Sequence, residues 1–178
     1  MYSNNKIKQD IIDRLLKLDE EVSLSFDEDN ITYEMVIVGG GALVLVDKLT
    51  RATQDIDAIM YPKELQPFLD KYDINNRVLA FMGNFAPDFY DRRVPIDKPS
   101  QKIKFFAASL EDIVIAKLFS QRPKDKQDIM NPDIVNALDW EKLDEIINSE
   151  DFNDNILNDH QRTMFLYNYR DYKEEAMK

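Results

Sequence analysis

The chain has 178 residues and no cysteine, which excludes disulfides and thiolate metal sites. Its 44% hydrophobic content predicts one domain with a buried core. The formal net charge of −11 argues against general DNA or RNA binding, which depends on Lys and Arg, but is compatible with a nucleotide or one RNA end at a local basic site. No apolar run approaches the roughly 20 residues that span a bilayer, and the N-terminus is polar. We therefore expect a cytoplasmic protein without membrane association.

The first half of the chain alternates predicted helices and strands. Residues 6–22 predict an amphipathic helix, because apolar side chains recur at helical spacing between charged ones. Residues 35–38 predict a buried strand that ends in three glycines. The further elements expected here are a helix at 42–49, a strand at 55–60, a helix at 63–71, and strands at 77–82 and 102–106. Three prolines limit regular structure over residues 87–99.

The second half is predicted to be helical. Ser109 and Asp112 have the spacing of a capping box, so a helix is expected to begin after Ser109. A polar turn at 121–129 leads into another helix, and helices are expected at 140–147 and 159–173. The pattern predicts an α/β or α+β core with a helical subdomain, and we expect an α+β (α/β-like) fold with a small mixed sheet of about four or five strands flanked by helices. We expect a core at residues 1–108, including the N-terminal helix, and a helical region at 109–178 packed on it.

Two aspartates and three glycines carry the chemical signal. Residues i and i+2 of a strand face the same way, so Asp55 and Asp57 can direct both carboxylates at one divalent cation, Mg²⁺ or Mn²⁺. Gly39 and Gly40 allow a backbone turn to approach another molecule closely, and the helix start beyond them offers unpaired N–H groups to an anion. Together these residues predict a site for a magnesium-bound polyphosphate.

The same residues resemble a known family pattern. The matching segments, in order, are Gly39-Gly40-Gly41-Ala42, Arg51-Ala52-Thr53-Gln54-Asp55-Ile56-Asp57, Glu111-Asp112 with Lys117-Leu118, and Arg122-Pro123-Lys124-Asp125-Lys126-Gln127-Asp128. This order resembles the nucleotidyltransferase superfamily with the DNA polymerase β-like fold. The finer resemblance is to the minimal AbiEii-like and related uncharacterised bacterial nucleotidyltransferases. It covers about residues 35–129.

The resemblance implies roles for the residues before the second predicted strand and within it. Asp55 and Asp57 would hold Mg²⁺ against the triphosphate of an NTP. Gly39 and Gly40 would let the loop meet the β- and γ-phosphates. Arg51 and Thr53 are implied in substrate binding, by positioning the aspartate strand.

The resemblance also implies roles in the helical half. Lys117 would add positive charge to the triphosphate. Asp125 or Asp128 would lie near it, organising Lys117 or Arg122, or completing the catalytic site. Arg122 is implied as a substrate-binding residue.

The implied activity is transfer of a nucleoside monophosphate from an NTP to an acceptor hydroxyl on an RNA 3′ end, a protein or a small molecule. By analogy, the protein would be the toxin of a toxin–antitoxin or phage-defence pair, with an antitoxin protein as partner. The alternative is a catalytically inactive nucleotidyltransferase-like domain that acts as a nucleotide sensor or a protein-interaction module. A dinucleotide-binding fold is a weaker alternative, because the glycines lack the Gly-x-Gly-x-x-Gly spacing.

A third carboxylate is not identified by spacing. Family members often carry one on a later strand, where residues 102–106 offer lysines instead. Asp88, Asp91 and Asp97 stay open as alternatives. The neighbouring pair Arg92-Arg93 either reaches a phosphate or balances Asp88 and Asp91.

Overall fold

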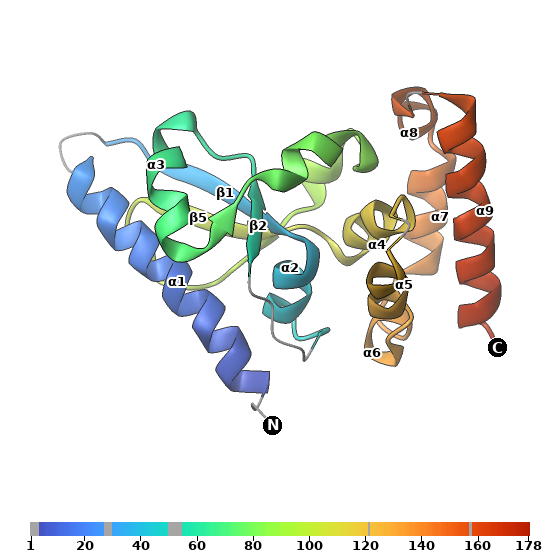
Figure 1. The fold of residues 1–178 in the computed structure, drawn as a ribbon, viewed down its shortest axis with the longest axis horizontal. Coiled ribbons are helices and arrows are strands. Elements are labelled where there is room, and N and C mark those ends of the chain that lie inside the picture. The colour runs from blue at the N-terminus through green and yellow to red at the C-terminus, as the bar shows by residue number, and fades with distance from the viewer. Residues whose placement is uncertain (1–3, 27–29, 50–54, 121, 157) are drawn as a thin grey trace. The chain divides into compact units, whose positions relative to one another are not determined.

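The centre of the sheet is β1 (Tyr33–Val38), whose residues 35–38 have no exposed surface. A computed structural model describes residues 4–26, 30–49, 55–120, 122–156 and 158–178 (Figure 1). The described strands form one mixed sheet in the order β3-β2-β1-β5-β4. The other strands are β2 (Ile56–Ile59), β3 (Ile74–Asn75), β4 (Val94–Pro95) and β5 (Ile103–Ala107). β1 is antiparallel to β2 and parallel to β5, β2 is parallel to β3, and β4 is antiparallel to β5.

The chain divides into two compact units. The first contains residues 1–79 and 93–108, and the second contains residues 80–92 and 109–178. The first unit holds the sheet with α1 (Asn4–Ser25), α2 (Gly39–Leu45) and α3 (Gln66–Leu69). The described helices of the second unit are α4 (Leu110–Leu118), α5 (Pro123–Ile129), α6 (Pro132–Val135), α7 (Trp140–Asn148), α8 (Glu150–Asn155) and α9 (Asp159–Ala176). This mixed sheet flanked by helices confirms the predicted α+β class.

A buried aspartate joins α1 to the start of β5. α1 packs along α2 and α3, as Figure 1 shows, and its apolar face is in the core. From this face, Asp19 accepts hydrogen bonds from the backbone N–H groups of Gln101, Lys102 and Ile103 at 2.6, 2.8 and 2.6 Å. Three donors satisfy a carboxylate that is only 3% exposed. The contact therefore fixes the entry of β5 into the sheet from a residue more than 80 positions away.

The predicted third strand at residues 77–82 is wrong. These residues belong to a 3₁₀ helix, Arg77–Asn84, and the third strand is the two-residue β3 before it. The side chain of Asn75 accepts a hydrogen bond from the backbone N–H of Arg77 at 3.0 Å, which turns the chain out of the sheet. The predicted helix at 63–71 is a series of short turns, with the 3₁₀ segments Lys63–Leu65 and Asp70–Tyr72 on either side of α3.

The other boundaries differ from the prediction mainly at the glycines and the prolines. The helix expected at 42–49 begins earlier, at Gly39, and ends at Leu45. Asp47 beyond it has a left-handed backbone, with φ of 61°, which is incompatible with a continuing helix. Within the proline-containing stretch, a 3₁₀ turn at Phe89–Arg92 precedes β4.

The described helices of the second unit other than α5 begin at side-chain caps. The side chain of Ser109 accepts a hydrogen bond from the backbone N–H of Asp112 at 3.1 Å, which confirms the predicted start of α4.

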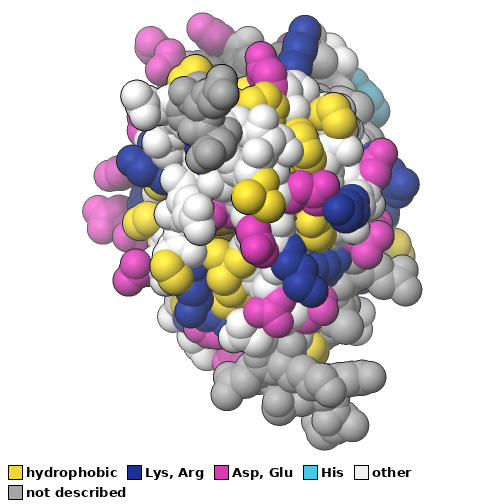
Figure 2. Space-filling view, turned by 90° about the vertical axis from the view of Figure 1, so that its left-hand side faces the viewer, with side chains coloured by type: hydrophobic (Ala, Val, Ile, Leu, Met, Phe, Trp, Pro, Cys, Tyr) yellow, Lys and Arg dark blue, Asp and Glu magenta, His cyan; other side chains and the backbone are white. Residues whose placement is uncertain are grey.

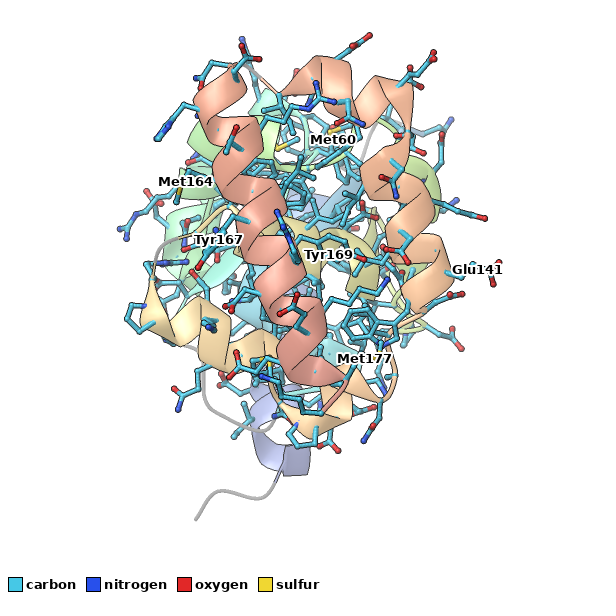
Figure 3. All side chains as sticks on the ribbon, turned by 90° about the vertical axis from the view of Figure 1, so that its right-hand side faces the viewer. Met60, Glu141, Met164, Tyr167, Tyr169 and Met177 are labelled. Carbon is cyan, nitrogen blue, oxygen red and sulfur yellow. The ribbon has the colours of Figure 1, made fainter. Side chains whose placement is uncertain are left out.

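α7 and α9 are joined by the Tyr169 hydroxyl, which donates to Asp144, and by Lys173, whose Nζ lies 2.5 Å from the same carboxylate. Figure 3 shows Tyr167 and Tyr169 on opposite sides of α9. No helix in the described ranges is both long and apolar enough to cross a membrane.

Charged side chains of both signs lie on the face of the molecule that Figure 2 draws. The face in Figure 2 carries acidic and basic side chains next to one another, with apolar side chains between them. This view shows no broad basic surface of the kind that general nucleic-acid binding requires.

Replacing Asp19 tests its role in stability. Asp19→Ala leaves backbone donors unpaired at the buried start of β5, so we expect the free energy of unfolding to fall by about 3 kcal/mol. Glu20→Ala, at the exposed neighbouring position of α1, is the matched control and should change it by less than about 0.5 kcal/mol. Urea denaturation followed by circular dichroism measures both; equal effects in the two variants would contradict the assignment.

Candidate functional site

The glycine turn and the aspartate strand meet at the C-terminal end of β1. In the β1–β2 pairing, Val38 lies opposite Asp57, so the residue after β1 is placed beside the beginning of β2. Gly39 has a left-handed backbone, with φ of 62°. A Cβ atom at Gly39 would lie 3.0 Å from Asp57 Oδ2. The carboxylate of Asp57 therefore packs directly against the backbone of the turn, and the missing side chain of Gly39 makes this approach possible.

Asp55 lies one residue before β2 rather than inside it, at a bend. Its side chain is 57% exposed, and its Oδ2 lies 4.0 Å from Arg77 Nη1. Asp57 is half-buried. Gly40 is half-buried in the first turn of α2. The structure thus places a backbone turn, two carboxylates and an arginine in the same part of the first unit.

Arg77 and Asn75 are candidate residues that the sequence pattern missed. Asn75 is the neighbour of Asp57 in the parallel β2–β3 pairing, and Arg77 follows it by two residues. No local motif marks either residue, because their nearness to the aspartates comes from the pairing of β2 with β3. A polar residue two positions before an arginine is too common a pattern to have signalled the site.

The donor set fits a hard divalent cation. Carboxylate oxygens are the ligands that Mg²⁺ prefers, and Mg²⁺ is commonly bound by one or two protein carboxylates while water and substrate phosphates complete its shell. Gly39 leaves the space beside Asp57 Oδ2 free of a Cβ atom. Within the ranges that the structure describes, no three His, Cys, Asp or Glu residues form a group that could hold a metal. A role for Asp55 and Asp57 in holding such an ion stays a prediction, in which water and substrate phosphates would complete the coordination shell.

Lys117 belongs to a buried ionic cluster in the second unit. Its Nζ donates to Asp125 Oδ1 at 2.5 Å and to Asp128 Oδ2 at 2.8 Å, and its side chain is 8% exposed. Ser120 donates to Asp125 Oδ2 at 2.6 Å. Arg122 donates from Nε to the same oxygen at 2.6 Å while 77% of its side chain is exposed. The sequence-predicted residues of this half are thus close together, with only Arg122 largely in solvent.

The environment of Asp125 favours its charged form. Burial raises the pKa of the Asp125 carboxyl, but hydrogen bonds from Lys117, Ser120 and Arg122 outweigh burial, so this pKa lies below its ordinary value. A carboxylate held in this way stays ionised at neutral pH and compensates the charge of Lys117.

The remaining sequence-predicted residues fall into two groups. Arg51 and Thr53 lie outside the described residues. Arg92 lies 2.5 Å from Asp88 and makes two hydrogen bonds with the fully buried Asp112, at 2.7 and 2.9 Å. Arg92 therefore balances acidic side chains.

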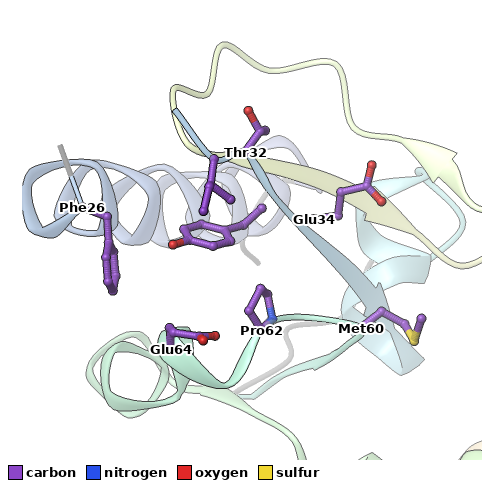
Figure 4. A pocket seen from close by; sticks show the side chains of 8 residues that line it. Phe26, Thr32, Glu34, Met60, Pro62 and Glu64 are labelled. Carbon is purple, nitrogen blue, oxygen red and sulfur yellow. The ribbon is translucent and has the colours of Figure 1, made fainter. Parts of the chain in front are cut away.

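A separate pocket lies at the other end of β1. It is open, has a volume of about 590 Å³, and is lined by residues that include Phe26, Tyr33, Glu34, Met60 and Glu64 (Figure 4). Tyr33 begins β1 and Met60 follows β2, so the pocket is separated from the Gly39–Asp57 contact by the length of the strand pair. Glu34 is paired with an arginine of the same unit at 3.4 Å. This pocket is distinct from the carboxylate site.

Comparison with known proteins identifies the family. A family model described as a nucleotidyltransferase of unknown function, DUF6036, matches residues 13–177. The chain belongs to this family. The match spans both units, so the nucleotidyltransferase family includes the helical half as well as the sheet. No curated protein and no solved structure matches the chain.

Gly39→Ala tests the contact between the turn and Asp57. Alanine at this position would have to adopt a left-handed backbone, and its Cβ atom would lie 3.0 Å from the Asp57 carboxylate. We therefore expect the free energy of unfolding to fall by about 1–2 kcal/mol. Gly41→Ala is the control, because its Cβ atom would make only an ordinary contact with Ile37 at 3.5 Å. This control should be neutral or stabilising by about 0.5 kcal/mol. Denaturation curves that rank the two variants in the opposite order would refute the geometry.

The pH dependence of stability tests the Asp125 cluster. Because the pKa of Asp125 is lowered on folding, its stabilising contribution is present above the unfolded-state value of about 3.9 and is lost as the pH falls below it. Asp125→Asn should lower the free energy of unfolding at pH 7 by about 1–3 kcal/mol. It should also make the decline in stability between pH 6 and pH 3 less steep than in the wild type. Asp154→Asn, at an exposed position of α8, should retain the wild-type slope. Urea unfolding at each pH gives the slopes, and parallel curves for wild type and Asp125→Asn would reject the cluster.

Proposed function

We propose that this protein is a Mg²⁺-dependent nucleotidyltransferase that moves a nucleoside monophosphate from an NTP to an acceptor hydroxyl. The observation that carries the proposal is the contact between Gly39 and Asp57, since it unites the phosphate-approaching turn and the metal-holding carboxylate in one unit. Membership of the nucleotidyltransferase family supports the same reaction class. The finer affiliation with the AbiEii-like and DNA polymerase β-like groups is part of the proposal.

In the reaction, the acceptor hydroxyl oxygen forms a bond to the α-phosphorus, and the bond from that phosphorus to the pyrophosphate oxygen breaks. The hydroxyl proton passes to solvent. The chemistry that bound Mg²⁺ supplies is polarisation of the α-phosphate and neutralisation of the pyrophosphate. Asp55 and Asp57 would hold the ion, and the turn at Gly39 and Gly40 would accommodate the outer phosphates.

The roles of Lys117, Asp125, Asp128 and Arg122 stay predictions of the family resemblance. Their geometry supports a division of labour in which the two aspartates orient Lys117 and Arg122. The acceptor classes that the proposal allows are an RNA 3′ end, a protein and a small molecule. As a physiological role, we propose the toxin of a toxin–antitoxin or phage-defence pair, with an antitoxin protein as its partner.

The second candidate function is a nucleotidyltransferase-like domain that binds nucleotide without transferring it. One observation favours this function. In the described part of the chain, no third acidic residue joins Asp55 and Asp57 in a group that could hold a metal. Such a domain would serve as a nucleotide sensor or a protein-interaction module.

Label transfer separates these functions. The protein is incubated with each α-³²P-labelled NTP, Mg²⁺ or Mn²⁺, and either total RNA or a cell lysate. We expect covalent labelling of an acceptor, reduced at least about 100-fold in Asp55→Ala/Asp57→Ala, because the ion that polarises the α-phosphate is lost. Asp133→Ala, at an exposed position of α6, is the control and should label normally. Thermal stabilisation by an NTP without labelling would support the sensor, and no response in either assay would leave only the interaction module.

A further inference from the structure

Among the residues that the structure describes, Arg77 is a cation that lies beside Asp55. Its Nη1 lies 4.0 Å from Asp55 Oδ2, and the two side chains are 83% and 57% exposed. We propose that Arg77 is an exchangeable counter-ion: it balances Asp55 when no metal is bound, and it binds the outer phosphates of an NTP when Mg²⁺ takes its place. This inference rests on the proposed function.

The ion pair is too exposed to serve folding. Pairs between solvent-exposed side chains contribute little to stability, because water screens the attraction and ordering two long side chains costs entropy. A separation of 4.0 Å also exceeds a hydrogen bond, so the guanidinium is not locked to the carboxylate. The pairing of Arg77 with Asp55 therefore costs little to break when another cation arrives.

The backbone of Arg77, in contrast, is held in place. Its N–H donates to the side chain of Asn75 at 3.0 Å, and Asn75 lies opposite Asp57 in the β2–β3 pairing. The backbone of Arg77 is thus held next to the strand that carries Asp57, while its guanidinium group is in solvent. A side chain anchored in this way can move between two neighbouring anions without a change in the fold.

Charge balance gives the exchange its direction. The two aspartates attract cations, but the triphosphate of an NTP is itself strongly anionic and would be repelled by them and by a chain of net charge −11. Once Mg²⁺ is bound, the metal ion balances the charge of Asp55, and Arg77 is released from this role. The planar guanidinium then matches phosphate oxygens through paired N–H donors. The metal ion and Arg77 therefore compete for Asp55, but both bind the polyphosphate when it is present.

Replacing Arg77 should change the affinity for a metal ion and the affinity for a metal-bound polyphosphate in opposite directions. Arg77→Ala should tighten the binding of Mn²⁺ alone by about fivefold, because a positive charge about 4 Å from the metal-holding carboxylate is removed. The same variant should weaken the binding of Mg²⁺-tripolyphosphate by about tenfold, because a charge-assisted hydrogen-bond donor is lost. Mn²⁺ binding is measured by electron paramagnetic resonance, and tripolyphosphate binding by calorimetry, both at low ionic strength.

Two further variants isolate the role of Arg77. Arg77→Lys keeps the charge but loses the paired donors, so Mn²⁺ binding should match the wild type while tripolyphosphate binding is weakened. Arg162→Ala removes an exposed arginine from α9 and should change neither affinity. A merely structural arginine would not shift the two affinities in opposite directions.

The outcomes distinguish this inference from the proposed function. If wild type binds both probes, the Asp55→Ala/Asp57→Ala variant loses both, and Arg77→Ala shows the opposed shifts, the inference is supported. If the aspartate variant loses binding but Arg77→Ala weakens both probes or leaves either unchanged, the inference is overturned and the proposed function stands. If the wild type binds neither probe, both are overturned.

Discussion

The antiparallel pairing of β1 with β2 is the constraint on which the candidate site depends. It places Val38 opposite Asp57, so that the left-handed Gly39 immediately after β1 lies against the carboxylate of Asp57. A shift of the register by one residue would turn Asp57 to the other face of the sheet. The fully buried residues of β1 resist such a shift, because it would misplace side chains that are packed on both faces of the strand. Core packing thus fixes the position of Asp57 relative to the glycine turn.

The two units hold charged side chains in different surroundings. In the second unit, Lys117 is enclosed by Asp125 and Asp128, so its charge is compensated inside the fold. In the first unit, the charged atoms of Asp55 and Arg77 lie 4.0 Å apart, and solvent reaches both side chains. An enclosed cluster favours one arrangement, whereas an exposed pair can exchange partners. The contrast separates a cluster that the fold encloses from a pair that solvent reaches.

Local signals made much of the fold predictable. The N-cap at Ser109 was identified because its hydrogen bond spans only three residues, and β1 because its apolar run is continuous. β3 was missed because Ile74 and Asn75 form a strand only through pairing with β2. In the site, the glycines and aspartates were found from spacing, and the Lys117 cluster came only from family resemblance. Arg77 was missed because a nonlocal strand pairing brings it to Asp55.

The hydrogen bonds of Asp19 have a consequence for synthesis of the chain. The helix α1 leaves the ribosome well before β5, yet its buried carboxylate finds its donors only at residues 101–103. Contacts so distant along the chain form late, since the intervening segment must first be closed into a loop. Until residues 101–103 have emerged, the Asp19 carboxylate on this helix therefore lacks its final donors. A helix that has not yet reached its final packing is a surface to which chaperones can bind.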